Sequence, residues 1–181
     1  MLEDAAYLTA HLELSGRTTE WRRHGCHIVV AEGKSKLPFV LAIAQELKIP
    51  TFVMFEADGD ETKEAQRRKH ETDNLSLFAM LGLESDGAFP RADVWGESFV
   101  VWAKSLRSAV EECVGNNGLT KAEEAVRQRE RLSDPGLEKN PMFVAEVLAE
   151  LKAVKVECPV LDELVRKITG FAEAVGDAAK K

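Results

Sequence analysis

Four acidic side chains follow two short apolar runs of the sequence, a position from which carboxylates can bind a divalent cation. One acid comes directly after the run 26–31, and three come after the run 51–55. Carboxylate oxygens are the ligands that Mg²⁺ and Mn²⁺ prefer in proteins. One or two of these ions would offset the mutual repulsion of the acids, so the pattern predicts a metal centre. The acids are Glu32, Glu56, Asp58 and Asp60.

The two apolar runs have the composition of buried β-strands. Both are short and continuous, and the segment 36–48 between them has apolar residues at helical spacing. A strand, a helix and a second strand form a βαβ unit with parallel strands. Because the carboxyl ends of parallel strands meet at one edge of a sheet, we expect the acids to converge there. The alternative is that each acid is a solvated loop residue or a helix N-cap.

The remaining sequence predicts an α/β fold that becomes purely helical toward the C-terminus. We expect a helical lead-in over 1–25, an α/β core over 26–115 and a helical domain over 116–181. Within the last region, 143–154 and 161–175 each present one apolar face and should pack as a hairpin. Further helices are expected at 2–15, 19–23, 61–83 and 104–114, and further strands at 93–95 and 98–102.

Composition and charge limit the classes of protein. The formal net charge of -7 argues against binding nucleic acid through a generally basic surface. The three cysteines are widely spaced without a CxxC pair, which indicates a reducing compartment rather than a disulfide framework or a zinc site. No apolar stretch reaches the roughly 18 residues of a membrane span, and the start of the chain is acidic. We therefore expect a cytoplasmic protein that makes no contact with membranes.

Several basic and aromatic side chains have an ordinary structural interpretation. The basic run 67–70 could steer a nucleic-acid backbone, but such runs are typically solvated helix faces. The two tryptophans of the predicted sheet could stack bases, although a place in the core is favoured. A surface histidine beside Arg and Lys is not expected to bind metal, and two further histidines lack ligand spacing. These residues are Trp95, Trp102, His70, His24 and His27.

The two acidic motifs resemble those of the Toprim domain, which topoisomerases, primases and certain nucleases share. One motif is a strand followed by Glu-Gly-x-Ser over 32–35, and the other is Phe-Glu-Ala-Asp-Gly-Asp over 55–60. With Asn74, the Lys104-Ser105 pair and the helical C-terminus, the chain looks most like the C-terminal Toprim region of OLD (overcoming lysogenization defect) family nucleases. The resemblance implies a Toprim-like parallel sheet flanked by helices, with an appended C-terminal helical domain.

The resemblance also implies a function. It implies a metal-dependent endonuclease that hydrolyses DNA phosphodiester bonds with Mg²⁺ or Mn²⁺, as the catalytic part of a larger protein with an ATPase domain. Glu32 would be the acid after the first strand, and Glu56 and Asp58 the paired acids after the second. Ser105 would be the polar residue at a later strand end, and Lys139 a lysine that reaches the scissile phosphate.

Three positions depart from the family pattern. Lys36 and Arg107 stand where the pattern has acids, and Glu56 stands where it has Asp. Glu keeps an oxygen ligand, whereas a cation removes one, so a second metal site would be impaired. The alternative function is therefore a degenerate Toprim module that binds nucleic acid or a partner without cleavage. A receiver-like phosphoacceptor domain also places acids at strand ends, but the helical C-terminal region suits it poorly.

Overall fold

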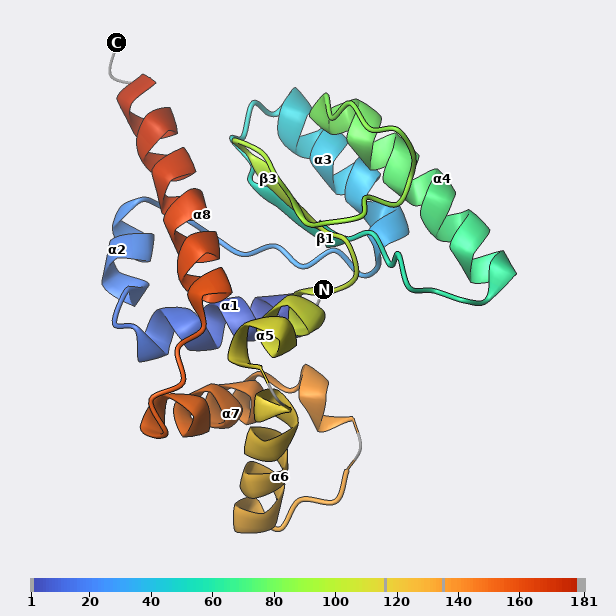
Figure 1. The fold of residues 1–181 in the computed structure, drawn as a ribbon. Helices are drawn as coiled ribbons and strands as arrows, with labels where there is room; N and C mark the ends of the chain where they lie inside the picture. The colour runs from blue at the N-terminus through green and yellow to red at the C-terminus, as the bar shows by residue number, and fades with distance from the viewer. Residues whose placement is uncertain (1, 116, 135, 179–181) are drawn as a thin grey trace. The chain divides into compact units, whose positions relative to one another are not determined.

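The chain forms two compact units in the computed structural model, which describes residues 2–115, 117–134 and 136–178. One unit spans residues 31–106 and contains the β-sheet (Figure 1). The other combines residues 2–30 with the chain from Arg107 onward and is helical. Helices and a β-sheet are both present, which confirms the predicted α/β class.

The sheet of the first unit has three short strands, β1 (Val53–Glu56), β2 (Val94–Trp95) and β3 (Phe99–Trp102). β3 lies in the centre, parallel to β1 and antiparallel to β2. The register places Val53 opposite Phe99. The sheet is therefore mixed, so the Toprim-like parallel sheet expected from the sequence is not confirmed.

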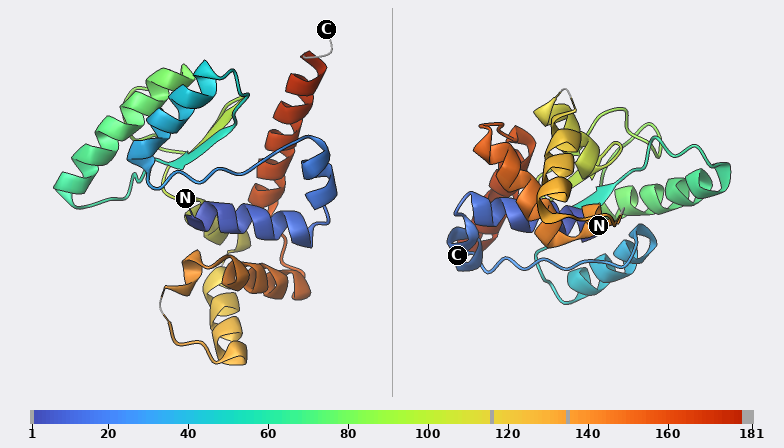
Figure 2. Two further views of the ribbon diagram at one scale, coloured as in Figure 1. Left: turned by 180° about the vertical axis from the view of Figure 1, so that it is seen from behind. Right: turned by 90° about the horizontal axis from the view of Figure 1, so that it is seen from below.

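Helices α3 (Leu37–Glu46) and α4 (Glu64–Leu81) cover one face of this sheet (Figures 1 and 2). Successive strand residues point to opposite faces, so one alternating set of β1 faces the helices. The side chains of that set are buried with Leu41 of α3 and with apolar residues of α4. The core cluster consists of Leu41, Val53, Phe55, Ala57, Leu77, Phe78 and Val101.

The strand predicted over residues 26–31 is wrong. These residues have no strand pairing, and Val29 is 74% exposed. β-branched residues favour a strand only where a neighbouring strand and a packed face receive them, because β-propensity depends on context. The run has the local composition of a strand, but it has neither a neighbouring strand nor a packed face. The expected βαβ unit therefore lacks its first strand.

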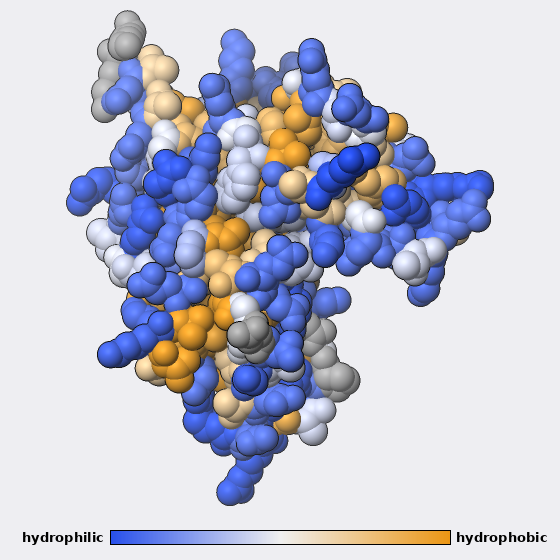
Figure 3. All heavy atoms as spheres, in the orientation of Figure 1, coloured by the Kyte–Doolittle hydropathy of each residue, from blue (hydrophilic) through white to orange (hydrophobic). Residues whose placement is uncertain are grey.

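Helix α3 presents apolar side chains to solvent as well as to the core. Phe39 is 70% exposed and Leu47 is 63% exposed, and Ile43 lies between them at the same helical spacing. Apolar surface accordingly lies over α3 in the space-filling view (Figure 3). The short 3₁₀ helix η1 (Lys34–Lys36) precedes α3.

The second unit is built from helices at both ends of the chain. α7 packs mainly against α1 and α6, and α8 packs against α1. Within the described residues, α7 and α8 therefore do not form the hairpin that the sequence predicted. The helices are α1 (Leu2–Leu14), α2 (Thr18–Arg23), α5 (Leu106–Val114), α6 (Gly118–Glu130), η2 (Leu137–Lys139), α7 (Pro141–Ala153) and α8 (Pro159–Ala178).

Local sequence explains several helix ends. Asn140 caps α7 by accepting a hydrogen bond from the backbone N–H of Met142 at 2.9 Å, and Pro141 occupies the permissive first turn. Gly82 ends α4 with a left-handed φ of 65°.

Across the part of the chain that the structure describes, no helix is both long and apolar enough to span a membrane.

Candidate functional site

The carboxyl ends of β1 and β3 lie side by side and bring two loops into contact. The backbone N–H of Ala57 donates to the carbonyl of Trp102 at 2.7 Å, and that of Gly59 donates to Ala103 at 2.9 Å. A Cβ atom at Gly59 would lie 2.7 Å from the Ala103 oxygen, so only glycine allows this approach. These two hydrogen bonds hold the backbone on both sides of Asp58, so they fix the point from which its side chain extends.

Asp58 lies in a cluster with two groups that carry or can carry a positive charge. Its Oδ2 atom is 2.6 Å from Nζ of Lys34 and 3.2 Å from Nδ1 of His70. The first contact is a hydrogen-bonded ion pair, whereas the imidazole is close enough for an ion pair but not oriented for a hydrogen bond. Asp58 has a φ of 55°.

Lys34 is the most buried member of this cluster. Only 9% of its side chain is exposed, and its ammonium donates a second hydrogen bond, to the carbonyl of Glu56 at 2.8 Å. Burial lowers the pKa of Lys34 below its ordinary value, and the hydrogen bond to Asp58 opposes that shift. Lys34 is thus a positive charge held against the carboxylate that the sequence predicted as a metal ligand.

Glu56 and Ser105 lie where the strand ends meet, as the sequence predicted. The Oε1 atom of Glu56 accepts a hydrogen bond from the backbone N–H of Leu106 at 3.3 Å, at the start of α5. Ser105 directly precedes that residue and is half-buried. The side chain of Glu56 projects from the strand on the side opposite Phe55. Oxygen groups from both strand ends therefore belong to one edge of the sheet.

The other predicted site residues are more exposed. Glu32 is 85% exposed and its Oε2 atom pairs with Nζ of Lys36 at 2.8 Å, and Asp60 is exposed. Among these described acids, no three have ligand atoms within 4.8 Å of one another. Lys139 lies exposed on η2, in the second unit. The structure therefore brings Asp58 together with Lys34 and His70 rather than assembling the four carboxylates.

Arg107 has a structural role in the second unit. Its guanidinium binds both carboxylate oxygens of Glu123 and lies 3.8 Å from Glu3. The hydrogen bonds that Arg107 donates to Glu123 raise the pKa of Arg107 above its ordinary value. Tyr7 lies beside Arg107 and Glu123, and its burial there raises its pKa. Arg107 is thus committed to Glu123 and its neighbours.

One face of α4 supports the strand ends, although the basic run 67–70 of this helix was expected from the sequence to be a solvated face. Arg67 donates to the carbonyl of Gly59 at 3.0 Å and lies over the ring of Phe89, 4.0 Å from its centroid. Arg67, His70 and Asn74 recur at a spacing of three and four residues, which places them on one helical face. That spacing is the signal by which a sequence could reveal them.

Asn74 fixes the loop after β1 to α4. It is fully buried, and its Nδ2 group donates to the carbonyls of Ala57 at 2.8 Å and Ala88 at 2.9 Å. A buried carbonyl that loses its donor is costly, because no water replaces the bond. Asn74 therefore holds the backbone next to Asp58 in place.

We expect Asn74→Ala to lower the free energy of unfolding by about 1 to 3 kcal/mol, because two buried carbonyls lose their donor. Urea unfolding followed by tryptophan fluorescence measures the change, since Trp95 and Trp102 both report on the first unit. Thr72→Ala, at an exposed position of the same helix, should change stability by no more than about 0.5 kcal/mol. Equal stability of the two variants would contradict this role of Asn74.

Comparisons of this chain with family models, with curated proteins and with solved structures gave no match. The chemistry of the site therefore follows from its own residues. Asp58 and Glu56 offer hard oxygen atoms, and Lys34 and His70 offer groups that can bind a phosphate. Metal-assisted phosphoryl chemistry uses hard oxygen ligands for the ion and nearby donors for the phosphate.

Proposed function

We propose that this protein is a metal-dependent phosphodiesterase that cleaves DNA, with its site at the carboxyl ends of β1 and β3. The observation that supports the proposal is the position of Asp58 at a strand end, with Lys34 and His70 against its carboxylate. A divalent ion in such a site stabilises the charge that develops on a phosphoryl group. The likeness of the second acidic motif, over 55–60, to that of Toprim nucleases also supports it.

Asp58 and Glu56 are the residues that would hold Mg²⁺ or Mn²⁺, and Ser105 would supply a further oxygen from the neighbouring strand end. Their donor chemistry fits a hard cation, because all three offer oxygen. Lys34 is the obstacle, since its ammonium already neutralises Asp58. In the proposed site Lys34 turns from Asp58 toward the phosphate, which keeps its positive charge useful to the reaction. The site is thus proposed for one ion, and Glu32 and Asp60 are not needed to complete it.

Cleavage of supercoiled plasmid by the purified chain tests the function. Nicked or linear DNA should form with Mn²⁺ or Mg²⁺ and should not form with EDTA. Agarose electrophoresis measures the products, and a mobility shift on the same DNA measures binding. DNA binding without cleavage at any metal concentration would contradict the nuclease proposal.

A second candidate function is a Toprim-like module that binds nucleic acid or a partner without cleavage. The two ion pairs of the acidic motifs favour it, because Lys34 neutralises Asp58 and Lys36 neutralises Glu32 without any metal. Such a module should show no heat of Mn²⁺ binding at Asp58. The two functions therefore differ in a single calorimetric titration.

Removing the charge of Lys34 should strengthen metal binding at Asp58. We expect Lys34→Met to lower the Kd for Mn²⁺ about tenfold, because a cation no longer competes within contact distance of the carboxylate. Isothermal titration calorimetry measures the effect. Lys69→Met makes the same change of net charge at an exposed position of α4 and should leave the Kd within about twofold. Weaker binding by Lys34→Met would show instead that Lys34 positions the carboxylate for the ion.

A further inference from the structure

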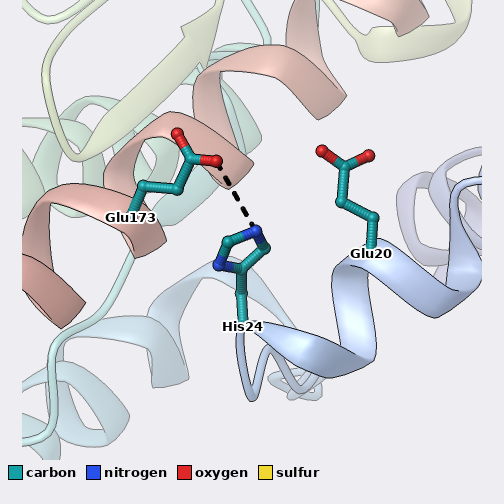
Figure 4. Close-up of side chains that lie close together, drawn as sticks. All are labelled: Glu20, His24 and Glu173. Atoms are coloured by element: carbon teal, nitrogen blue, oxygen red, sulfur yellow. Dashed lines mark ion pairs between the residues drawn. The ribbon is translucent and has the colours of Figure 1, made fainter.

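A histidine and two glutamates from opposite ends of the chain lie together in the second unit. Glu20 and His24 belong to α2 and the residue that follows it, and Glu173 belongs to α8 (Figure 4). Their ligand atoms all lie within 4.8 Å of one another. Among the described residues, no other group of three His, Cys, Asp or Glu side chains is this close.

The spacing of the two α2 residues places their side chains on one face. Glu20 and His24 are four residues apart, one turn of helix, and both extend toward the side where α8 carries Glu173 (Figure 4). Arg17 also links α2 to α8, since its Nη2 donates to Oγ1 of Thr169 at 3.5 Å. The three ligands are therefore carried by helices that already contact each other.

The distance between His24 and Glu173 suits two ligands of one ion better than a hydrogen bond. Nε2 of His24 lies 3.6 Å from Oε1 of Glu173, which is long for a direct hydrogen bond. Two ligand atoms bound to one tetrahedral Zn²⁺ lie about 3.3 Å apart, given bonds of about 2.0 to 2.1 Å. A small movement would therefore place both atoms on one metal ion.

Charge favours a cation at this place. Two carboxylates carry two negative charges, and one of them already has a cationic partner, since Nε of Arg17 donates to Oε2 of Glu20 at 3.1 Å. One imidazole nitrogen with two carboxylates selects a transition ion, because nitrogen ligands suit Zn²⁺ and its neighbours better than Mg²⁺.

We infer that Glu20, His24 and Glu173 form a site for a divalent transition ion such as Zn²⁺, with water completing the coordination. The ion would connect α2 to α8 and so stabilise the second unit. This site is separate from the strand-end site of the first unit, and its test does not depend on DNA cleavage. From the sequence we did not expect His24 to bind a metal, because Glu173 is remote from Glu20 and His24 along the chain.

Zinc titration of the intact chain tests the inference. Calorimetry should show a Zn²⁺ site that is retained in Asp58→Asn, and the melting temperature should rise with zinc, because the ion binds only the folded protein. His24→Ala and Glu173→Gln should each weaken binding by at least about tenfold. Their folding is checked by circular dichroism and by melting in EDTA, so that lost binding is not mistaken for lost structure.

Three controls decide between this site and others. His11→Ala removes the other histidine that pairs with an acid of α8, Asp162 at 3.0 Å, and should leave zinc binding unchanged. Asp58→Asn should also leave it unchanged, which separates this site from the strand-end site. Cys113→Ser removes the thiol next to Cys158. No zinc binding, unchanged binding by His24→Ala, or lost binding by Cys113→Ser would each overturn the inference.

Discussion

Asp58→Asn should reduce metal-dependent nicking of plasmid DNA by about 10²- to 10³-fold. A catalytic metal ion contributes several kcal/mol to the transition state, and about 1.4 kcal/mol corresponds to a factor of ten in rate. The substitution removes the charge that would hold the ion but retains the size of the side chain. Asn also tolerates the left-handed backbone of this position, where φ is 55°. Initial rates of nicking at saturating Mn²⁺ measure the effect.

The control for this variant is the same substitution at an exposed acid of the same unit. Asp86 lies exposed in the loop that precedes β2, so Asp86→Asn changes the net charge equally. It should leave the nicking rate within about twofold of the original protein. If both variants cut DNA at the original rate, Asp58 holds no catalytic ion and the strand-end site is not the nuclease centre.

Phe55→Ala should lower the free energy of unfolding by about 3 to 5 kcal/mol. Phe55 is 0% exposed, and its ring packs against that of Phe78 on α4, with the centroids 6.1 Å apart. Truncation leaves a cavity between β1 and α4 and also removes the transfer free energy of the ring. Urea unfolding followed by tryptophan fluorescence measures the change.

A matched variant lies on the neighbouring helix. Phe39→Ala makes the same chemical change at a residue of α3 that is 70% exposed, and it should alter stability by no more than about 0.5 kcal/mol. A similar loss in both variants would mean that the exposed face of α3 is covered in solution. A small loss in Phe55→Ala would contradict the placement of β1 in the core.

The helices and the three strands of the described residues could be predicted from the sequence because their patterns are local. The segments 51–55, 93–95 and 98–102 each correspond to a strand, with ends that differ by at most two residues. The segment 26–31 has the same kind of composition but no strand beside it. Pairing depends on contacts between distant parts of the chain, so composition alone could not distinguish these runs.

The candidate site was predictable only in part. Glu56 is the last residue of β1 and Asp58 lies just beyond it, close to where the sequence placed them, because a residue's place at a strand end is a local property. The charge beside Asp58 was not foreseen, since Lys34 reaches it from the turn before α3 and His70 from α4. The sequence shows which acidic side chains are available as metal ligands. Only the folded structure shows which basic side chains lie against them and offset their charge.

The backbone of Asp58 sets stability against the proposed activity. A left-handed conformation costs most residues with a Cβ atom roughly 1 to 2 kcal/mol; Asp and Asn adopt it more readily, and glycine adopts it without that cost. Glycine after Ala57 would therefore remove the remaining strain, but it would also remove the carboxylate. A chain that keeps a carboxylate here accepts backbone strain at the one position where its charge meets both Lys34 and His70.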